Sequence, residues 1–171
     1  MRLTMGSWGL ALALAGLGAL ACNEKSKTVQ SFRAVFDPAA PPPDTIPEAL
    51  DYAADLQVDL TEMAKLPVGV LWADVAPGDT LQPPVATGDS VELAFQAWLP
   101  NGVLVDSAVT PVRIGAGDVI AGLDAGIPGM RPGGKRKLVI PPGLAYGADG
   151  RDNIPANMVL VYDVEVRAKI P

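Results

Sequence analysis

Hydrophobic and polar residues alternate regularly in two segments of the chain, at 91–99 and at 158–168. In the first segment the apolar side chains share one face, whereas Glu92 and Gln96 point the other way. The apolar faces consist of Val91, Leu93, Phe95, Ala97 and Leu99 in one segment and of Met158, Leu160, Tyr162, Val164 and Val166 in the other. Because successive side chains of a strand point to opposite sides, this alternation predicts two half-buried β-strands.

Shorter apolar runs predict further strands around these two. Turn-forming residues bound each run, as expected for strands joined by tight connections. Asn101-Gly102 follows the first alternating segment and makes a tight reversal, which is a strong hairpin signal. The candidate strands are 67–75, 103–106, 111–114 and 135–140.

A helical pattern occurs once in this part of the chain, after residue 117. Asp118 is a natural N-cap for it. The apolar stripe of the helix consists of Val119, Leu123 and Ile127. Because Gly122 and Gly126 weaken so short a helix, packing against a sheet must hold it. The elements predict an α+β domain over residues 63–171, with an antiparallel, five- to six-stranded curved sheet wrapped around one short helix.

The N-terminus has the pattern of an export signal. Arg2 precedes an apolar stretch that runs to Ala21 and is too short to span a bilayer comfortably. The only cysteine of the chain, Cys22, follows at once. This arrangement resembles a bacterial lipoprotein signal, in which the cysteine becomes the lipid-modified N-terminus. An ordinary secretory signal with a chance cysteine is the alternative interpretation.

Residues 22–62 are interpreted as a lipid-anchored, proline-rich, acidic tether. Prolines at positions 38, 41, 42, 43 and 47 favour an extended, semi-rigid spacer. Residues 47–56 predict either a short helix, with Leu50, Ala53 and Ala54 on one side, or a strap that lies across the domain. Asn23, rather than aspartate after the cysteine, favours the periplasmic face of the outer membrane as the location.

Composition excludes several classes of function. The chain contains no histidine, which removes Ser-His and Cys-His catalysis and histidine-containing zinc sites. Its net charge is −6, and no basic face of any size is available to bind nucleic acid. The run Lys135-Arg136-Lys137 is interpreted as a solvated strand start. No metal or organic cofactor is implied, and a monomer is the default.

The ordered series of segments resembles the FKBP-type peptidyl-prolyl isomerases. "VATGDSVELAFQAWLPNGVLVDS" is similar to the entry strand and hairpin of that family. "GAGDVIAGLDAGIPGMRPGGKRKLVIPPGLAYGADG" is similar to its helix, glycine-rich exit and tyrosine loop, and "IPANMVLVYDVEV" to its proline corner and closing strand. The resemblance covers residues 63–171. It implies that the domain accelerates rotation about X-Pro bonds in proline-containing peptides and unfolded exported proteins.

The resemblance also implies a pocket. Asp106, Tyr146 and Ile120 would be the catalytic residues: Asp106 near the twisting carbonyl, Tyr146 bonded to the substrate backbone, and the Ile120 amide offered to a peptide carbonyl. The residues that would contact substrate are Phe95, Val105, Val119, Leu123, Ala145, Ile154 and Tyr162.

Three of these positions depart from the family pattern. Phe95 stands where a tyrosine is usual, Val105 where an aromatic residue normally precedes the aspartate, and Leu123 where many members have tryptophan. The bowl is therefore thinner in aromatic side chains, and we expect reduced or substrate-selective turnover.

Each site residue also has a purely structural interpretation. Tyr146 could anchor its own loop, Asp106 could cap the turn with Ser107, and Tyr162 could be core packing. Accordingly, the alternative functions are a non-catalytic peptide-binding or chaperone module with a degenerate pocket, and an envelope adaptor in which the acidic stalk is the recognition element.

Overall fold

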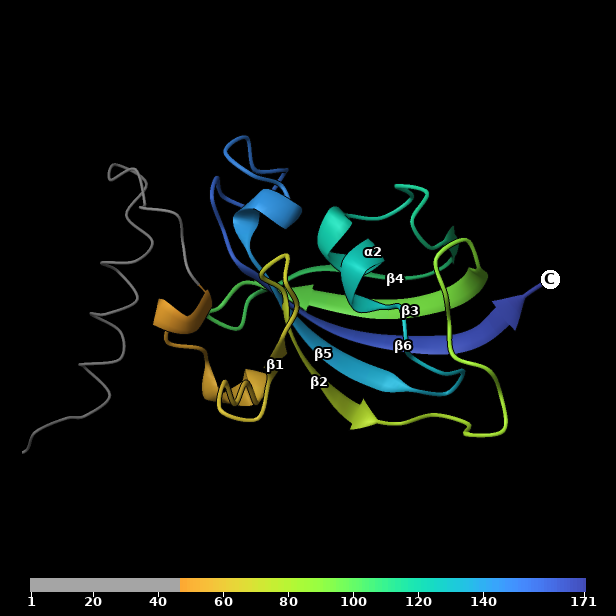
Figure 1. Cartoon of the computed structure of the whole chain (residues 1–171). Helices are drawn as coiled ribbons and strands as arrows, with labels where there is room; N and C mark the ends of the chain where they lie inside the picture. Colours follow the sequence, from red (N-terminus) through yellow and green to blue (C-terminus); the bar gives the residue numbers. More distant parts are fainter. Residues whose placement is uncertain (1–46) are drawn as a thin grey trace, which may run out of the picture.

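The computed structural model describes residues 47–171, which form a six-stranded antiparallel sheet and one α-helix, α2 (Figure 1). The strands are β1 (Ala64–Lys65), β2 (Leu71–Ala76), β3 (Ser90–Trp98), β4 (Leu104–Arg113), β5 (Lys135–Ile140) and β6 (Leu160–Ile170). Their order across the sheet is β1-β2-β5-β6-β3-β4. The predicted fold class is confirmed. The predicted signal peptide, Cys22 and the first part of the tether lie outside the described residues.

The two alternating segments form the centre of the sheet. They become β3 and β6, which pair with each other along almost their whole length. Val91, Leu93 and Ala97 are fully buried on β3, as are Leu160 and Val166 on β6. The alternation therefore identified the strands that carry most of the core.

Strand β4 is longer than predicted. Residues 103–106 and 111–114 were expected as separate extended pieces, but one strand runs from Leu104 to Arg113. The intervening residues pair with β3 throughout. Most of β4 is exposed or half-buried, so its pairing comes from backbone hydrogen bonds with a neighbour and leaves little periodicity in the sequence.

Helix α2 is shorter than predicted and starts later. It spans Ala121–Gly126, and the N-cap is Ile120 rather than Asp118. The Asp118 carboxylate instead accepts a hydrogen bond from the Arg113 backbone amide at 2.9 Å. Val119 thus lies before the helix, whereas Leu123 and Ile127 are buried as the stripe predicted. An aspartate caps whichever free amide lies nearest, so a cap signal alone does not choose between them.

Glycines in α2 allow the helix to approach β5 closely. A Cβ atom at Gly122 would lie 2.3 Å from the Ile140 side chain, and one at Gly126 would lie 2.7 Å from that of Leu138. The Gly126 carbonyl also accepts a hydrogen bond from the Arg136 guanidinium at 2.8 Å. The two residues that weaken the isolated helix are therefore those that seat it on the sheet.

Residues 47–62, which we call the strap, cover part of the sheet face opposite α2 (Figure 1). The predicted short helix is wrong: the strap contains only two 3-10 turns, at Pro47–Ala49 and Ala54–Leu56. Leu50 and Leu56 are buried, and they form a second apolar cluster with Leu71, Val139, Val159 and Val161. Of the two structures predicted for residues 47–56, the strap across the domain is therefore the correct one. The domain was predicted to begin at residue 63, but packed residues extend N-terminal to Met63.

Two of the three bases at the start of β5 are buried, contrary to the interpretation of the sequence, and only Lys135 is exposed. Only 6% of Arg136 and 8% of Lys137 is exposed. Arg136 pairs with Asp74 at 2.7 Å and lies over the ring of Trp72, and Lys137 pairs with Asp163. The register places each carboxylate directly opposite its base. Cross-strand partners of this kind are invisible until the strand order is known.

Within residues 47–171, no helix has the length and apolar character needed to cross a bilayer.

Candidate active site

A cavity of about 100 Å³ brings together residues from the edge strand and from the loop after β5. Its lining consists of Val105, Asp106, Tyr146, Arg151, Asp152, Asn153 and Ile154. Four of these seven were predicted site residues, from two segments 40 or more positions apart in the sequence. The fold therefore assembles at one place side chains that the sequence indicated separately.

Strand β4 supplies Val105 and Asp106 at a register shift. Asp106 lies opposite Ala97, whereas Leu104 lies opposite Trp98, so Val105 is an extra residue in the ladder. A bulge of this kind bends the strand and redirects its side chains. Both Val105 and Asp106 thereby reach the cavity.

Residues 141–159, the tyrosine loop, hold Tyr146 and Ile154 by backbone bonds. The Gly147 amide donates to the Pro142 carbonyl at 2.9 Å, and the Asn157 amide donates to the Gly147 carbonyl at 2.7 Å. Gly150 has φ +65°, and a Cβ atom there would lie 2.5 Å from the Ile154 carbonyl oxygen. The loop is thus compact because it contains glycine where the chain turns back on itself.

Tyr162, on β6, is almost fully buried. Burial raises the pKa of Tyr162, and the hydrogen-bonded hydroxyl of Tyr146 and the nearby Asp106 carboxylate raise this pKa further. The ring of Phe95 packs against Tyr162 with centroids 5.8 Å apart. Tyr162 is therefore a core residue that supports Tyr146 from within the fold, and it does not line the cavity.

The remaining predicted residues pack on the same core. Leu123 is buried, and Val119, Ile120 and Ala145 are half-buried against the cluster that includes Phe95, Tyr146 and Ile154. Asp124 accepts hydrogen bonds from the amides of Gly115 and Gly117 and so fixes the loop that leads to Ile120. Within residues 47–171, the Ile120 amide donates to no other group.

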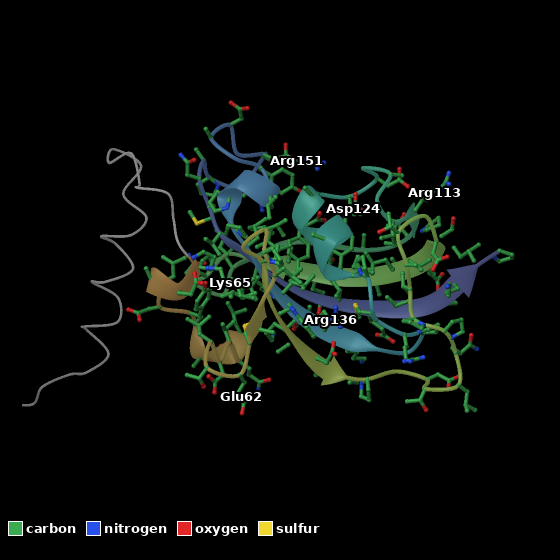
Figure 2. The ribbon with its side chains drawn as sticks, viewed as in Figure 1. Glu62, Lys65, Arg113, Asp124, Arg136 and Arg151 are labelled. Carbon is green, nitrogen blue, oxygen red and sulfur yellow. The ribbon has the colours of Figure 1, made fainter. Side chains whose placement is uncertain are left out.

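Arg151 is the cavity residue that the sequence did not predict. Its guanidinium lies 5.5 Å from the centre of the Tyr146 ring, and its Nη1 donates to the Tyr146 hydroxyl at 3.5 Å. Tyr146, Asp152 and Asp106 together raise the pKa of Arg151. In Figure 2, Arg151 is drawn between the tyrosine loop and α2. A single charged residue in a polar loop gives no signal of its own, and only its spacing from Tyr146 could have indicated it.

The comparisons with known proteins place the chain in a family. The family model for the FKBP-type peptidyl-prolyl cis-trans isomerases matches residues 82–167, which is half of the chain. The chain belongs to this family. The match contains β3 to β5, the tyrosine loop and most of β6, and therefore every residue that lines the cavity.

FKBP relatives are similar over the domain only. FK506-binding protein 4 of Chaetomium thermophilum is 44% identical over 86 residues, which is 48% of this chain and 18% of that protein. FK506-binding protein 2 of Dictyostelium discoideum is 46% identical over 86 residues, 47% of this chain and 65% of that protein. The chain thus spans less than two thirds of the length of these relatives.

Solved FKBP-type structures share the fold. The crystal structure of AtFKBP13 is 35% identical, with a TM-score of 0.58, and the match covers 64% of this chain and 99% of that one. A peptidyl-prolyl cis-trans isomerase from Pseudomonas syringae pv. tomato is 28% identical, with a TM-score of 0.59, over 69% of this chain and 87% of that one.

The cavity of this FKBP domain is small and contains no cluster of metal ligands. Among the described residues, no group of three or more acidic or cysteine side chains could hold a metal ion. A larger groove of about 670 Å³ lies over β2 to β6 beside Gln57 of the strap, and Phe95 is the only predicted site residue that lines it. Of the three predicted catalytic residues, Asp106 and Tyr146 line the smaller cavity, and none lines the groove.

Proposed function

We propose that this protein is a peptidyl-prolyl cis-trans isomerase for X-Pro bonds. The observation that supports the proposal is the shared cavity of Asp106, Tyr146 and Ile154, with Ile120 packed on the same core. Amide resonance imposes a barrier of about 18–20 kcal/mol on rotation. Rotation removes the charge separation of the planar amide, so a cavity that is poor in water favours the twisted form over the planar one.

The residues have distinct roles in this mechanism. The Ile120 amide and the Tyr146 hydroxyl bind backbone groups beside the proline and hold the peptide in place. Ile154 and Val105 form apolar walls for the proline ring. Asp106 lies where the carbonyl turns, and its hydrogen-bonding capacity orients the site. None of these roles needs a nucleophile or a metal ion.

Tyr146→Phe tests the role of the hydroxyl. One lost hydrogen bond is worth about 1 kcal/mol, so kcat/KM for a short X-Pro peptide should fall about fivefold. Tyr52→Phe is the matched control, because Tyr52 lies in the strap and donates to the Pro47 carbonyl. NMR exchange spectroscopy on the peptide measures both variants. Equal rates for wild type and Tyr146→Phe would remove Tyr146 from the mechanism.

A second candidate function is peptide binding without turnover. Val105 favours it, because this cavity residue replaces the aromatic wall that the family pattern predicts. This candidate predicts that peptides containing X-Pro bind with a measurable Kd, whereas their exchange rate stays at the uncatalysed value.

We propose in addition that the chain is exported and held by lipid at Cys22, at the periplasmic face of the outer membrane. The support is the apolar segment that ends at the only cysteine. Labelled fatty acid should be incorporated into the wild-type chain and not into Cys22→Ala. Equal incorporation into the two chains would rule out this anchor.

A further inference from the structure

Strand β4 forms one edge of the sheet. It pairs with β3 on one side, and within residues 47–171 no strand pairs with its other side. An unpaired edge exposes backbone N–H and C=O groups that a further strand can use. The backbone groups of β4 that do not hydrogen-bond to β3 are the exposed ones. Four observations identify the residues to which they belong.

Even-numbered residues near the end of β4 hydrogen-bond toward β3. The Ile114 amide donates to the Asp89 carbonyl at 2.9 Å, and the Ile114 carbonyl accepts from Gly88 at 2.8 Å. Pro111, opposite Glu92, has no N–H with which to pair. The Arg113 amide points away from β3 and donates to Asp118 at 2.9 Å. Because the direction alternates along a strand, the amides of Ser107 and Val109 also point outward.

The outward edge is therefore closed at one end and open at the other. Pro111 and the Asp118 cap close it from residue 111 onward, as natural edge strands commonly are. The open part, Ser107 to Val109, directly follows Val105 and Asp106, which line the cavity. A chain that lies along the open part therefore continues from the cavity.

The open part of the β4 edge also borders the groove of about 670 Å³. Ser107, Ala108 and Val109 line it together with Ala94 and Gln96 of β3. Val109 is 51% exposed. A strand added beside β4 would point alternate side chains over this face, where Val109 offers apolar contact.

We infer that the segment of a client polypeptide that flanks the X-Pro bond binds the open edge of β4 as an added β-strand. Main-chain hydrogen bonds to Ser107 and Val109 provide the binding, and the cavity receives the proline. The favoured substrates are X-Pro sequences with an extended, proline-free flank of a few residues. This inference rests on the isomerase function proposed above and specifies its substrate class.

A second copy of the chain fits the edge less well than a client does. The open part offers only two outward amides before Pro111 ends it, and pairing between two short strands is marginal in water. A client polypeptide is also bound through its proline in the cavity. Two hydrogen bonds to the outward amides are therefore enough to strengthen a contact that already exists.

Matched peptides test the inference with the full wild-type chain. One peptide is a minimal X-Pro tetrapeptide, the second adds a flank of four β-forming residues, and the third carries N-methyl groups on alternate amides of that flank. We expect KM for the flanked peptide to be about 30-fold lower than for the other two, as two hydrogen bonds of about 1 kcal/mol each would give. Catalysed exchange of all three peptides with the same KM would overturn the inference and leave the isomerase proposal standing.

Val109→Pro provides the test in the protein. It removes an outward amide in the way that Pro111 already does, and Val109→Thr is the matched control that keeps the amide. We expect Val109→Pro to abolish the advantage of the flanked peptide and to leave the minimal peptide unchanged. If Val109→Pro does not fold, the N-methylated peptide still decides. A concentration-dependent dimer of the wild type that Val109→Pro disperses would overturn the inference in favour of a second copy.

No exchange of the minimal peptide above the uncatalysed rate would instead contradict the isomerase proposal. The two failures therefore give different results.

Discussion

At the scale of single residues, Arg151 sets the electrostatic character of the cavity mouth. Its side chain is 62% exposed, its guanidinium faces the Tyr146 ring, and Asp152 lies 3.5 Å away. The cavity thus presents a cation beside the acidic side chains of Asp106 and Asp152. Arg151 is the only positively charged residue among those that line the cavity.

Arg151→Glu should invert the charge preference of the site. Peptides with glutamate beside proline should lose kcat/KM relative to peptides with lysine by about two- to fivefold at low salt, as exposed ion pairs allow. Salt should weaken the effect. Arg167→Glu, which makes the same change in net charge away from the cavity, is the matched control. A preference that shifts equally in both variants would show that net charge, and not Arg151, is responsible.

At the scale of elements, the close contact between α2 and β5 fixes the position of Ile120. Ile120 is the N-cap of the helix, so any movement of α2 on the sheet moves the amide assigned to substrate binding. Gly122 makes the tightest approach, against the buried side chain of Ile140. The two glycines thus link helix packing to the geometry of the site.

Gly122→Ala should lower the free energy of unfolding by about 1–3 kcal/mol, as overpacking of a dense core does. Gly143→Ala is the matched control, since a Cβ atom at Gly143 meets nothing within 4 Å. Urea denaturation measures both variants. Equal stability of the two would mean that α2 shifts freely, contrary to the close packing described above.

At the scale of the whole molecule, the strap gives the sheet a second apolar cluster, so that both faces of the sheet carry buried apolar side chains. Core residues cover the α2 face, whereas Leu50 and Leu56 cover Leu71, Val139 and Val161 on the other. One strap residue, Gln57, lines the groove that reaches the edge of β4. Residues N-terminal to the family match therefore contribute to the stability of the fold.

Leu56→Ala should cost about 2–5 kcal/mol of unfolding free energy, because it empties a buried site. Leu81→Ala is the control, since Leu81 is 94% exposed and its loss should cost almost nothing. Thermal unfolding of the full chain measures the difference. If both variants unfold at the wild-type temperature, the strap does not stabilise the domain.

The sequence predicted the elements whose own side chains carry a pattern. Strands β3 and β6 alternate because one face is core, and the helix stripe identified Leu123 and Ile127. It failed where structure depends on partners: the pairing of β4, the burial of Arg136 against Asp74, and the cap formed by Asp118. These contacts join segments distant in sequence, so composition and periodicity do not contain them.

The candidate site shows the same division. Asp106, Tyr146 and Ile154 could be proposed from ordered motifs, and they line one cavity. Arg151 and the open edge at Ser107 and Val109 could not, because they depend on loop geometry and on strand register. Motifs therefore indicate the chemistry of the site, whereas its borders require the fold.

The most direct test of this account is the cis-trans exchange rate of a minimal X-Pro peptide in the presence of the full chain. NMR exchange spectroscopy at substoichiometric protein reports it without a coupled enzyme. Uncatalysed exchange takes tens to hundreds of seconds. The account predicts that the rate rises in proportion to protein concentration and that Asp106→Ala, still folded, reduces the increment. A rate that stays at the uncatalysed value for the folded wild type would contradict it.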